Sequence, residues 1–181
     1  MDPGTQDSRG DIELLGIFLQ SFGRACVNLK LLLGEQADAL LSSVPDGWYP
    51  AGAFLAAVHA IEARFPAPGP IKERLGVEMM TLWYEQGPGR SIVKRGADFL
   101  QFQTGSSGYH SVVRGPAASV GEFALEALDE MAGTAVVRSS TVFDRTIERG
   151  VLIGGMQLAG DLEYVDVDND ADPSVYRIRF R

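Results

Sequence analysis

The stretch IELLGIFLQSFGRACVNLKLLL, residues 12–33, carries the strongest periodic pattern in the chain. Its apolar residues recur at alternating steps of three and four, which places them on one stripe of an α-helix. Neighbouring apolar residues widen this stripe, so we predict a helix that contacts more than one neighbour. Burial within the chain's own domain is the favoured explanation, and a homodimer interface is the alternative. The candidate interface residues are Leu15, Leu19, Phe22 and Leu29.

Further helices are predicted on the C-terminal side of this stretch, up to about residue 89. A Pro-Asp-Gly turn and a run rich in proline and glycine separate them, because both residue types interrupt helices. Pro70 is suited to the first turn of the last of these helices, which directs Met79 and Leu82 or Trp83 inward. The predicted segments are a short helix over residues 35–43 and longer helices over residues 54–65 and 70–86.

After residue 90 the pattern changes to that of strands and shorter helices. Two apolar segments flank a glycine-rich turn and predict a hairpin. Ser119 and Glu122 have the spacing of a capping box, in which each side chain accepts from the other residue's backbone N–H, and so predict a helix start. Asp144 is suited to cap a second helix after a β-branched run. The predicted elements are strands 99–103 and 109–114, helix 119–133, strand 134–143, helix 144–160 and strands 162–168 and 175–180.

These elements predict an α+β protein in the order α-α-α-β-β-α-β-α-β-β, with N-terminal helices packed on a C-terminal, mainly antiparallel sheet that carries two helices. The 181 residues, 45% hydrophobic and 22% charged, suit one domain with a packed core. We assign residues 11–181 to this domain, with a helical part over residues 11–89 and a sheet part over residues 90–181. Residues 1–10 are predicted to be a disordered tail.

The net charge and the cysteine content limit the cellular compartment and the classes of binding partner that are expected. A net charge of −8 repels phosphate backbones and anionic headgroups, so nucleic acid is a poor candidate partner. The sequence shows no signal peptide and no apolar run near the ~20 residues of a membrane span. Cys26 is the single cysteine, so no intramolecular disulfide can form and the cysteine pairs of a zinc site are absent. We predict a cytoplasmic protein without a metal.

The sequence has few residues suited to catalysis. His59 and His110 are the only histidines. His59 lies off the apolar stripe of its helix and is predicted to face solvent, and His110 lies beside a polar turn. No G-x-S-x-G motif is present, and Cys26, within an apolar stripe, is predicted to be a weak nucleophile with a raised pKa. An enzyme built from dispersed residues, such as His110 with Asp98 or Asp144, is the least favoured hypothesis.

Two other patterns are similar to ligand sites but lack essential features. The alternating aspartates of residues 166–172 resemble a calcium loop, yet Ala171 replaces its turn glycine and Arg177 its bidentate glutamate. A solvated hairpin turn is therefore predicted. The glycines of residues 150–160 follow the start of their helix, so its free N–H groups do not face a nucleotide phosphate there. Close helix packing is the favoured explanation, and room for a ligand is the alternative.

Two segments carry a resemblance to known families. Tyr109-His110-Ser111-Val112-Val113-Arg114 is similar to the Tyr-x-Ser-x-Arg signature of H-NOX domains. The sequence Arg149–Gly155 resembles the glycine-bearing helix of the vinyl-reductase group. With its order of elements, the chain therefore resembles the H-NOX and 4-vinyl-reductase-like ligand-binding superfamily, whose architecture TRAPP tethering subunits share. It is also similar to a myxobacterial paralogous family that has no assigned activity.

The resemblance implies that Tyr109, Ser111 and Arg114 clamp the propionates of a haem and that an earlier helical histidine ligates its iron. Arg114 comes one residue later than in the signature, which turns it to the opposite face of a regular strand. His59, the only earlier histidine, lies off the apolar face of its helix. We therefore predict a relative without haem or another cofactor, and haem is the less favoured alternative.

The leading functional hypothesis is a non-enzymatic sensory or regulatory domain that binds a small hydrophobic ligand between the N-terminal helices and the sheet. Because the sequence contains no output module, such a domain would signal through a partner protein. The alternative is a dimeric scaffold or protein-interaction module without a ligand. The candidate ligand-binding residues are Met79, Trp83, Tyr109, Ser111, Arg114 and Gly154.

Overall fold

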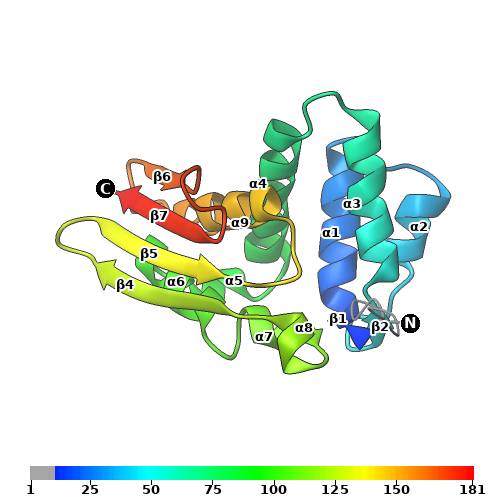
Figure 1. The fold of residues 1–181 in the computed structure, drawn as a ribbon, viewed down its shortest axis with the longest axis horizontal. Coiled ribbons are helices and arrows are strands. Elements are labelled where there is room, and N and C mark those ends of the chain that lie inside the picture. The colour runs from blue at the N-terminus through cyan, green and yellow to red at the C-terminus, as the bar shows by residue number, and fades with distance from the viewer. Residues whose placement is uncertain (1–10) are drawn as a thin grey trace, which may run out of the picture.

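The computed structural model describes residues 11–181, so the predicted tail of residues 1–10 lies outside the described residues. The chain forms two lobes with a pair of helices between them (Figure 1). One lobe contains the helices α1 (Gly16–Asn28), α2 (Glu35–Leu41) and α3 (Gly52–Arg64), and the other contains a four-stranded sheet. The central pair is α4 (Gly69–Gln86) and α9 (Arg145–Gln157). The predicted α+β class is confirmed.

The first helix is shorter than the periodicity predicts. Residues Glu13–Leu15 form strand β1 instead, which pairs with β2 (Trp48–Pro50) and β3 (Val113–Arg114) in a small antiparallel sheet. Helix α1 begins at Gly16, where an added Cβ would collide with the carbonyl of Val44. Pairing with strands far along the chain therefore overrides the local helical pattern.

The predicted hairpin of residues 99–114 is wrong. Residues Gly89–Ile92 form α5, Gly96–Thr104 form α6 and Tyr109–Val112 form α7, so only β3 remains of the second strand. Asp98 caps α6, because its carboxylate accepts from the backbone N–H of Arg95 at 2.9 Å. The neighbours Phe99 and Leu100 are both buried, which a helix allows and an alternating strand does not.

The predicted helix of residues 119–133 is also wrong. This segment forms the short helix α8 (Ala117–Val120) and strand β4 (Phe123–Asp129). Gly121 adopts a left-handed φ of 71° and ends α8. The backbone N–H of Glu122 donates to the hydroxyl of Ser140 at 2.9 Å, not to the preceding serine. The bond expected within a capping box is therefore made by a residue that follows the neighbouring strand.

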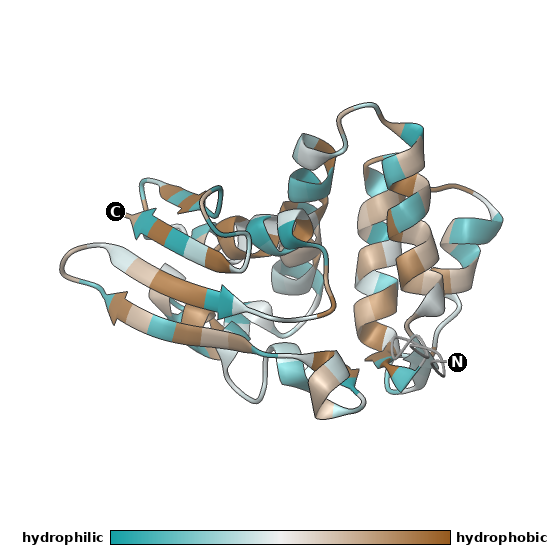
Figure 2. Ribbon diagram, viewed as in Figure 1, coloured by the Kyte–Doolittle hydropathy of each residue, from teal (hydrophilic) through white to brown (hydrophobic). Residues whose placement is uncertain are grey.

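The main sheet is antiparallel with the order β4-β5-β7-β6. Strands β5 (Thr134–Ser139), β6 (Val165–Asp168) and β7 (Val175–Phe180) lie within the segments predicted as strands, and α9 follows Asp144 as predicted. The Asp144 carboxylate accepts from two backbone N–H groups of the first turn, at 3.0 and 3.1 Å. Hydrophobic and polar residues alternate along the strands (Figure 2), and α6 and α9 pack against the sheet.

Helices α4 and α9 approach each other closely at glycines. An added Cβ at Gly150 would collide with the carbonyl of Glu73, and one at Gly154 would lie 2.8 Å from the Cα of Val77. The glycine-bearing helix is therefore packed on α4. Gly154 faces that helix, which was the favoured explanation for these glycines, and its contact with a ligand stays a prediction.

Candidate functional site

An apolar cavity of about 320 Å³ lies where the two lobes meet the central helices. Side chains of α1, α3, α4, α6, α7 and α9 line it, together with residues of α5, of β4 and of the segment before α9. The volume lies at the lower end of the range for small-molecule sites. Because its walls come from both lobes, a ligand here would contact each of them.

Burial divides the cavity lining into a rim and a floor. The rim consists of exposed residues on α1, α5 and the segments around α7, and the floor consists of buried residues. The rim residues are Ile17, Pro88, Ile92, Ser107 and Ser111, and the floor residues are Phe54, Met79, Tyr109, Phe123 and Ile147. The cavity is therefore accessible from the rim and closed by the core at the floor.

Aromatic rings form much of the lining. Phe18 of α1 stacks on Phe143, with ring centroids 4.9 Å apart and planes at 6°. Trp83 of α4 stacks on Phe102 of α6 at 5.0 Å. Phe54 meets Phe143 edge-on at 5.3 Å. Such rings favour apolar and flat molecules, which gain dispersion contacts and offset stacking.

A buried polar cluster surrounds Glu148, which is 4% exposed and also lines the cavity. Its carboxylate accepts from the Ser139 hydroxyl at 2.9 Å, the Arg145 guanidinium at 2.8 Å and the Tyr176 hydroxyl at 2.7 Å. The Thr141 hydroxyl donates to it as well. A carboxylate has about four acceptor positions, so the chain itself fills those of Glu148.

Electrostatics keep the tyrosines of this region neutral and the arginine charged. Burial and the nearby charge of Glu148 raise the pKa of Tyr109 and of Tyr176 above the usual tyrosine value. Burial lowers the pKa of Arg145, but the charge and hydrogen bond of Glu148 outweigh this effect and raise the pKa. The Tyr109 hydroxyl donates to the carbonyl of Val120 at 2.5 Å, so its proton is engaged within the chain.

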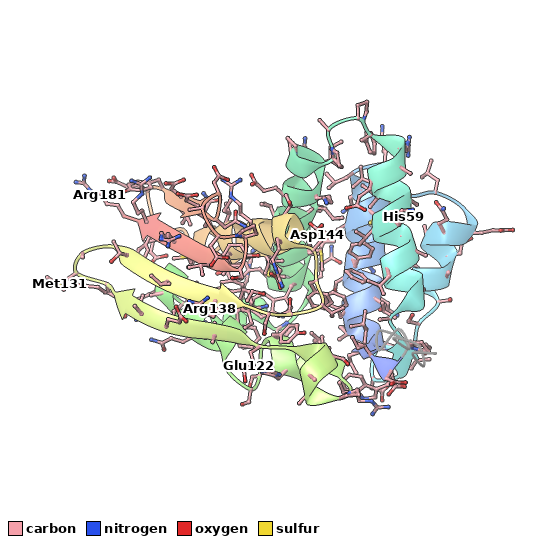
Figure 3. All side chains as sticks on the ribbon, in the orientation of Figure 1. His59, Glu122, Met131, Arg138, Asp144 and Arg181 are labelled. Atoms are coloured by element: carbon pink, nitrogen blue, oxygen red, sulfur yellow. The ribbon has the colours of Figure 1, made fainter. Side chains whose placement is uncertain are left out.

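A second buried cation connects α9 to the helical lobe. The Nζ atom of Lys72 on α4 lies 2.7 Å from Glu62 of α3 and 2.7 Å from the N-cap residue Asp144. Burial lowers the pKa of Lys72, but the hydrogen bonds and charges of Asp144 and Glu62 outweigh it and raise the pKa. Figure 3 labels Asp144 at the junction of the lobes. Lys72 therefore links three helices beside the cavity.

The structure brings four of the six predicted ligand residues to the cavity: Met79, Trp83, Tyr109 and Ser111. Arg114 lies elsewhere, because its guanidinium pairs with Glu13 at 2.7 Å and lies over the ring of Trp48 at 4.4 Å. Arg114 therefore lies outside the cavity that Ser111 lines, and its contact with a ligand stays a prediction. Gly154 packs on α4.

The first helix is buried by its own chain. Leu19 is 1% exposed and Phe22 is 0% exposed, so in this conformation neither offers surface to a second protomer. Leu15 lines the cavity, and Leu29 is half-buried against the core. The stripe is covered within the domain at Leu19 and Phe22, which was the favoured explanation. A homodimer stays a prediction.

Among the described residues, neither histidine forms an ion pair with Asp98 or Asp144, the candidate catalytic carboxylates. The side chain of His59 is 85% exposed on α3 (Figure 3), and His110 is exposed with its ring beside that of Tyr109. Asp98 caps α6, and Asp144 caps α9. Each carboxylate therefore has a structural partner, and the combination suggested for an enzyme is not assembled.

Within residues 11–181, no cluster of histidine, cysteine and carboxylate side chains is arranged to hold a metal ion. None of the helices described there combines the length and apolar character needed to cross a membrane. Cys26 is buried, which raises the pKa of its thiol to about 12 and makes it unreactive, as predicted.

Sequence reasoning missed several lining residues. Phe18 lies beside the main apolar stripe of α1. Phe143 was predicted to be the last residue of a strand, but the observed strand β5 ends at Ser139. Glu148 lies three residues after Arg145 and next to the inward-facing Ile147 on α9. The sequence signal that could have identified it was an i,i+3 ion pair beside a buried apolar residue. Gln103 was assigned to a strand and carried no distinguishing pattern.

The lining supplies few groups that suit haem. Haem iron is held by histidine, cysteine, methionine or tyrosine side chains. Among the described lining residues there is no histidine, lysine or arginine, so iron has no imidazole and the propionates have no cation there. The Tyr109 hydroxyl is engaged, and the Glu148 carboxylate would repel a propionate. These residues do not fit a haem site of the kind that the resemblance implies.

No family model and no curated protein matches the chain. Solved H-NOX structures match it along most of its length. A mutant H-NOX protein from K. algicida, unliganded and in the Fe(II) form, is 12% identical with a TM-score of 0.62, covering 93% of this chain and 97% of that chain. The H-NOX protein from S. oneidensis in the Fe(II)NO state is 11% identical with a TM-score of 0.61, covering 93% and 98%.

A third H-NOX structure, from a study of heme distortion, is 10% identical with a TM-score of 0.63, covering 92% and 93%. These matches contradict the prediction of no cofactor, because they are haem proteins and point to haem as the cofactor found with this fold. Identities this low show the fold and carry over no residue roles. The resemblance read from the sequence is confirmed at that level: the chain has an H-NOX-like α+β fold.

Proposed function

We propose that this protein is a sensory or regulatory domain that binds a small apolar molecule in the cavity and signals to a partner protein. The observation that carries this proposal is an accessible cavity of about 320 Å³, lined by aromatic side chains from both lobes. Matched proteins of this fold are described in an NO-ligated state and as an oxygen-binding domain related to soluble guanylate cyclases. Ligand binding is therefore favoured over catalysis.

The contacts around the cavity offer a route from the ligand to the lobes. Phe143 lines the cavity and precedes Asp144, which caps α9 and binds Lys72. Lys72 in turn binds Glu62 of the helical lobe. A ligand that displaces the Phe143 ring would shift this cap and the link to Glu62, and a partner that binds across the lobes would detect the change.

Haem is the second candidate ligand, and the Fe(II) and heme descriptions of the matched structures favour it. The two candidates differ in what they would leave on the purified protein. A small apolar molecule adds a defined mass without visible colour. Haem adds an intense absorption band in the visible range. One preparation therefore distinguishes them.

Native mass spectrometry and an absorption spectrum of gently purified protein test the proposal. Val151→Phe would fill the cavity from α9, and Val44→Phe makes the same change at an exposed position that does not line it. We expect wild type and Val44→Phe to retain a small mass that Val151→Phe loses. A haem band lost only in Val151→Phe would favour the second candidate. If added apolar probes also fail to bind wild type, the proposal is wrong.

A further inference from the structure

We infer that the ligand of this cavity is a neutral molecule with a flat apolar body and one hydrogen-bonding group, and that this group binds the side-chain amide of Gln103. The inference rests on the function proposed above, because it names the ligand class of the same cavity. Gln103 lies in the last turn of α6, is half-buried and lines the cavity. Three properties of the lining support this ligand class.

The charges of the lining disfavour an ionic ligand. Glu148 is the one charged side chain among the described lining residues. Ser139, Arg145 and Tyr176 donate to its carboxylate, together with Thr141. An anion would find no cation in the cavity and would lie near this carboxylate, whereas a cation would have to displace one of these donors. Desolvation of an unpaired charge is strongly unfavourable, so a neutral ligand fits best.

The hydrogen-bonding groups of the lining are mostly engaged within the chain. The hydroxyls of Ser21, Tyr109 and Ser111 each donate to a backbone carbonyl. No hydrogen bond joins the Gln103 amide to another of the described residues, and an amide offers both donors and an acceptor. The Ser107 hydroxyl is likewise not engaged as a donor to residues 11–181, but it lies exposed at the rim. The indole N–H of Trp83, also half-buried in the lining, donates to none of the described residues either, but an indole cannot accept. Gln103 is therefore the half-buried lining residue that can both donate to a ligand and accept from it.

The aromatic surfaces define the apolar part of the ligand. The stacked pairs Phe18–Phe143 and Trp83–Phe102 both line the cavity, and Phe102 is the chain neighbour of Gln103. A flat body gains dispersion and offset-stacking contacts with these rings. A hydroxyl or carbonyl on that body can satisfy the amide, which would otherwise lose hydrogen bonds to water when the cavity is filled.

Four monosubstituted benzenes of similar size test the ligand class: toluene, benzyl alcohol, benzoate and benzylammonium. Their binding to the full chain is measured by nuclear magnetic resonance titration, in which the side-chain amide signal of Gln103 reports contact directly. We expect benzoate and benzylammonium to bind at least about 100-fold more weakly than benzyl alcohol, because each buries an unpaired charge. Toluene should bind as well, but it should move the Gln103 amide signal less than benzyl alcohol does, because it acts through its ring current and makes no hydrogen bond.

Two variants separate the role of Gln103 from that of the cavity. Gln103→Leu should weaken benzyl alcohol about 5-fold and leave toluene unchanged or tighter, because it removes one hydrogen bond. Gln101→Leu lies on the same helix but is exposed and outside the cavity, so it should change neither. Strong binding of either ion, or equal effects of the two variants, would overturn the ligand class and leave the cavity as a binding site. If neither toluene nor benzyl alcohol binds, both proposals are wrong.

Discussion

The cavity and the polar cluster lie on either side of Glu148 and use burial in opposite ways. In the polar cluster each buried group has a partner, and no buried side-chain nitrogen or oxygen of the described residues lacks one. In the cavity the chain leaves space beside apolar rings and the amide of Gln103. Complete pairing indicates a structural role, and unfilled space indicates binding. Substitutions in the two regions should therefore affect different measurements.

The largest expected effect is in the polar cluster, with Glu148→Gln. The new amide places a donor where Arg145, Tyr176 and the serine and threonine hydroxyls also donate, and it leaves the half-buried guanidinium of Arg145 without a countercharge. We expect the free energy of unfolding to fall by about 4 kcal/mol, measured by urea denaturation. Glu126→Gln, in the exposed pair with Arg138, is the control and should cost below about 1 kcal/mol. Equal losses would contradict a structural role for the polar cluster.

The next effect concerns α9, the helix that carries Glu148 and contributes to both regions. Gly150→Ala places a methyl group against the carbonyl of Glu73, so α4 and α9 must move apart. We expect a loss of about 3 kcal/mol in unfolding free energy, from overpacking. Gly52→Ala is the matched control, because nothing lies within 4 Å of its added Cβ. That change should be neutral or slightly stabilising, since alanine favours a helix. A similar loss in both variants would show that the close contact is unimportant.

A smaller effect is expected from the link beside the cavity. Lys72→Met removes the ammonium that binds Glu62 and Asp144 and should cost about 2 kcal/mol in unfolding free energy. Because the pKa of Lys72 is raised in the folded protein, the link contributes fully below the ordinary lysine pKa. The difference between wild type and Lys72→Met should therefore be constant from pH 7 to 9 and shrink above about pH 10.4.

Lys94→Met serves as the control for this link, because Lys94 is exposed and its ammonium donates, among the described residues, only to the nearby carbonyl of Arg90. Its effect on unfolding should be below about 0.5 kcal/mol at each pH. A wild-type advantage over Lys72→Met that grows at high pH would have the wrong sign for a paired cation. Such a result would contradict the link between the helical lobe and α9.

Local sequence signals correctly predicted the elements whose structure does not depend on pairing with a distant segment. Helix α9 begins directly after its N-cap residue Asp144, and β5 lies within a run rich in β-branched residues. For these two elements the predicted and observed structures therefore agree. Strand β1 and strand β4 depend on distant partners instead. Leu14 pairs with Tyr49, and the backbone of Glu122 bonds Ser140, which no local pattern encodes. Non-local pairing therefore decided β1 and β4, two of the elements that the sequence mispredicted.

The candidate site divides in the same way. Met79, Trp83 and Tyr109 were recognised because large apolar side chains on inward faces are visible in a single helix or motif. The role of Glu148 depends on donors before and after it in the chain, one of them Tyr176 on the last strand. What distinguishes Gln103 is that its side-chain amide makes no hydrogen bond to another of the described residues. That property has no signature in sequence and becomes visible only when its neighbours are placed.

The smallest expected effect on folding is in the cavity, with Gln103→Leu. Since no described residue bonds this amide, its loss removes no internal hydrogen bond, and we expect the unfolding free energy to change by less than about 0.5 kcal/mol. Gln20→Leu is the matched control, because the Gln20 amide donates to the carbonyl of Ser43 at 2.5 Å and should cost about 1 kcal/mol. A glutamine that stabilised the fold as much as Gln20 would belong with the polar cluster. If Gln103→Leu changes only the affinity for benzyl alcohol, the cavity has a binding role that differs from the structural role of the polar cluster.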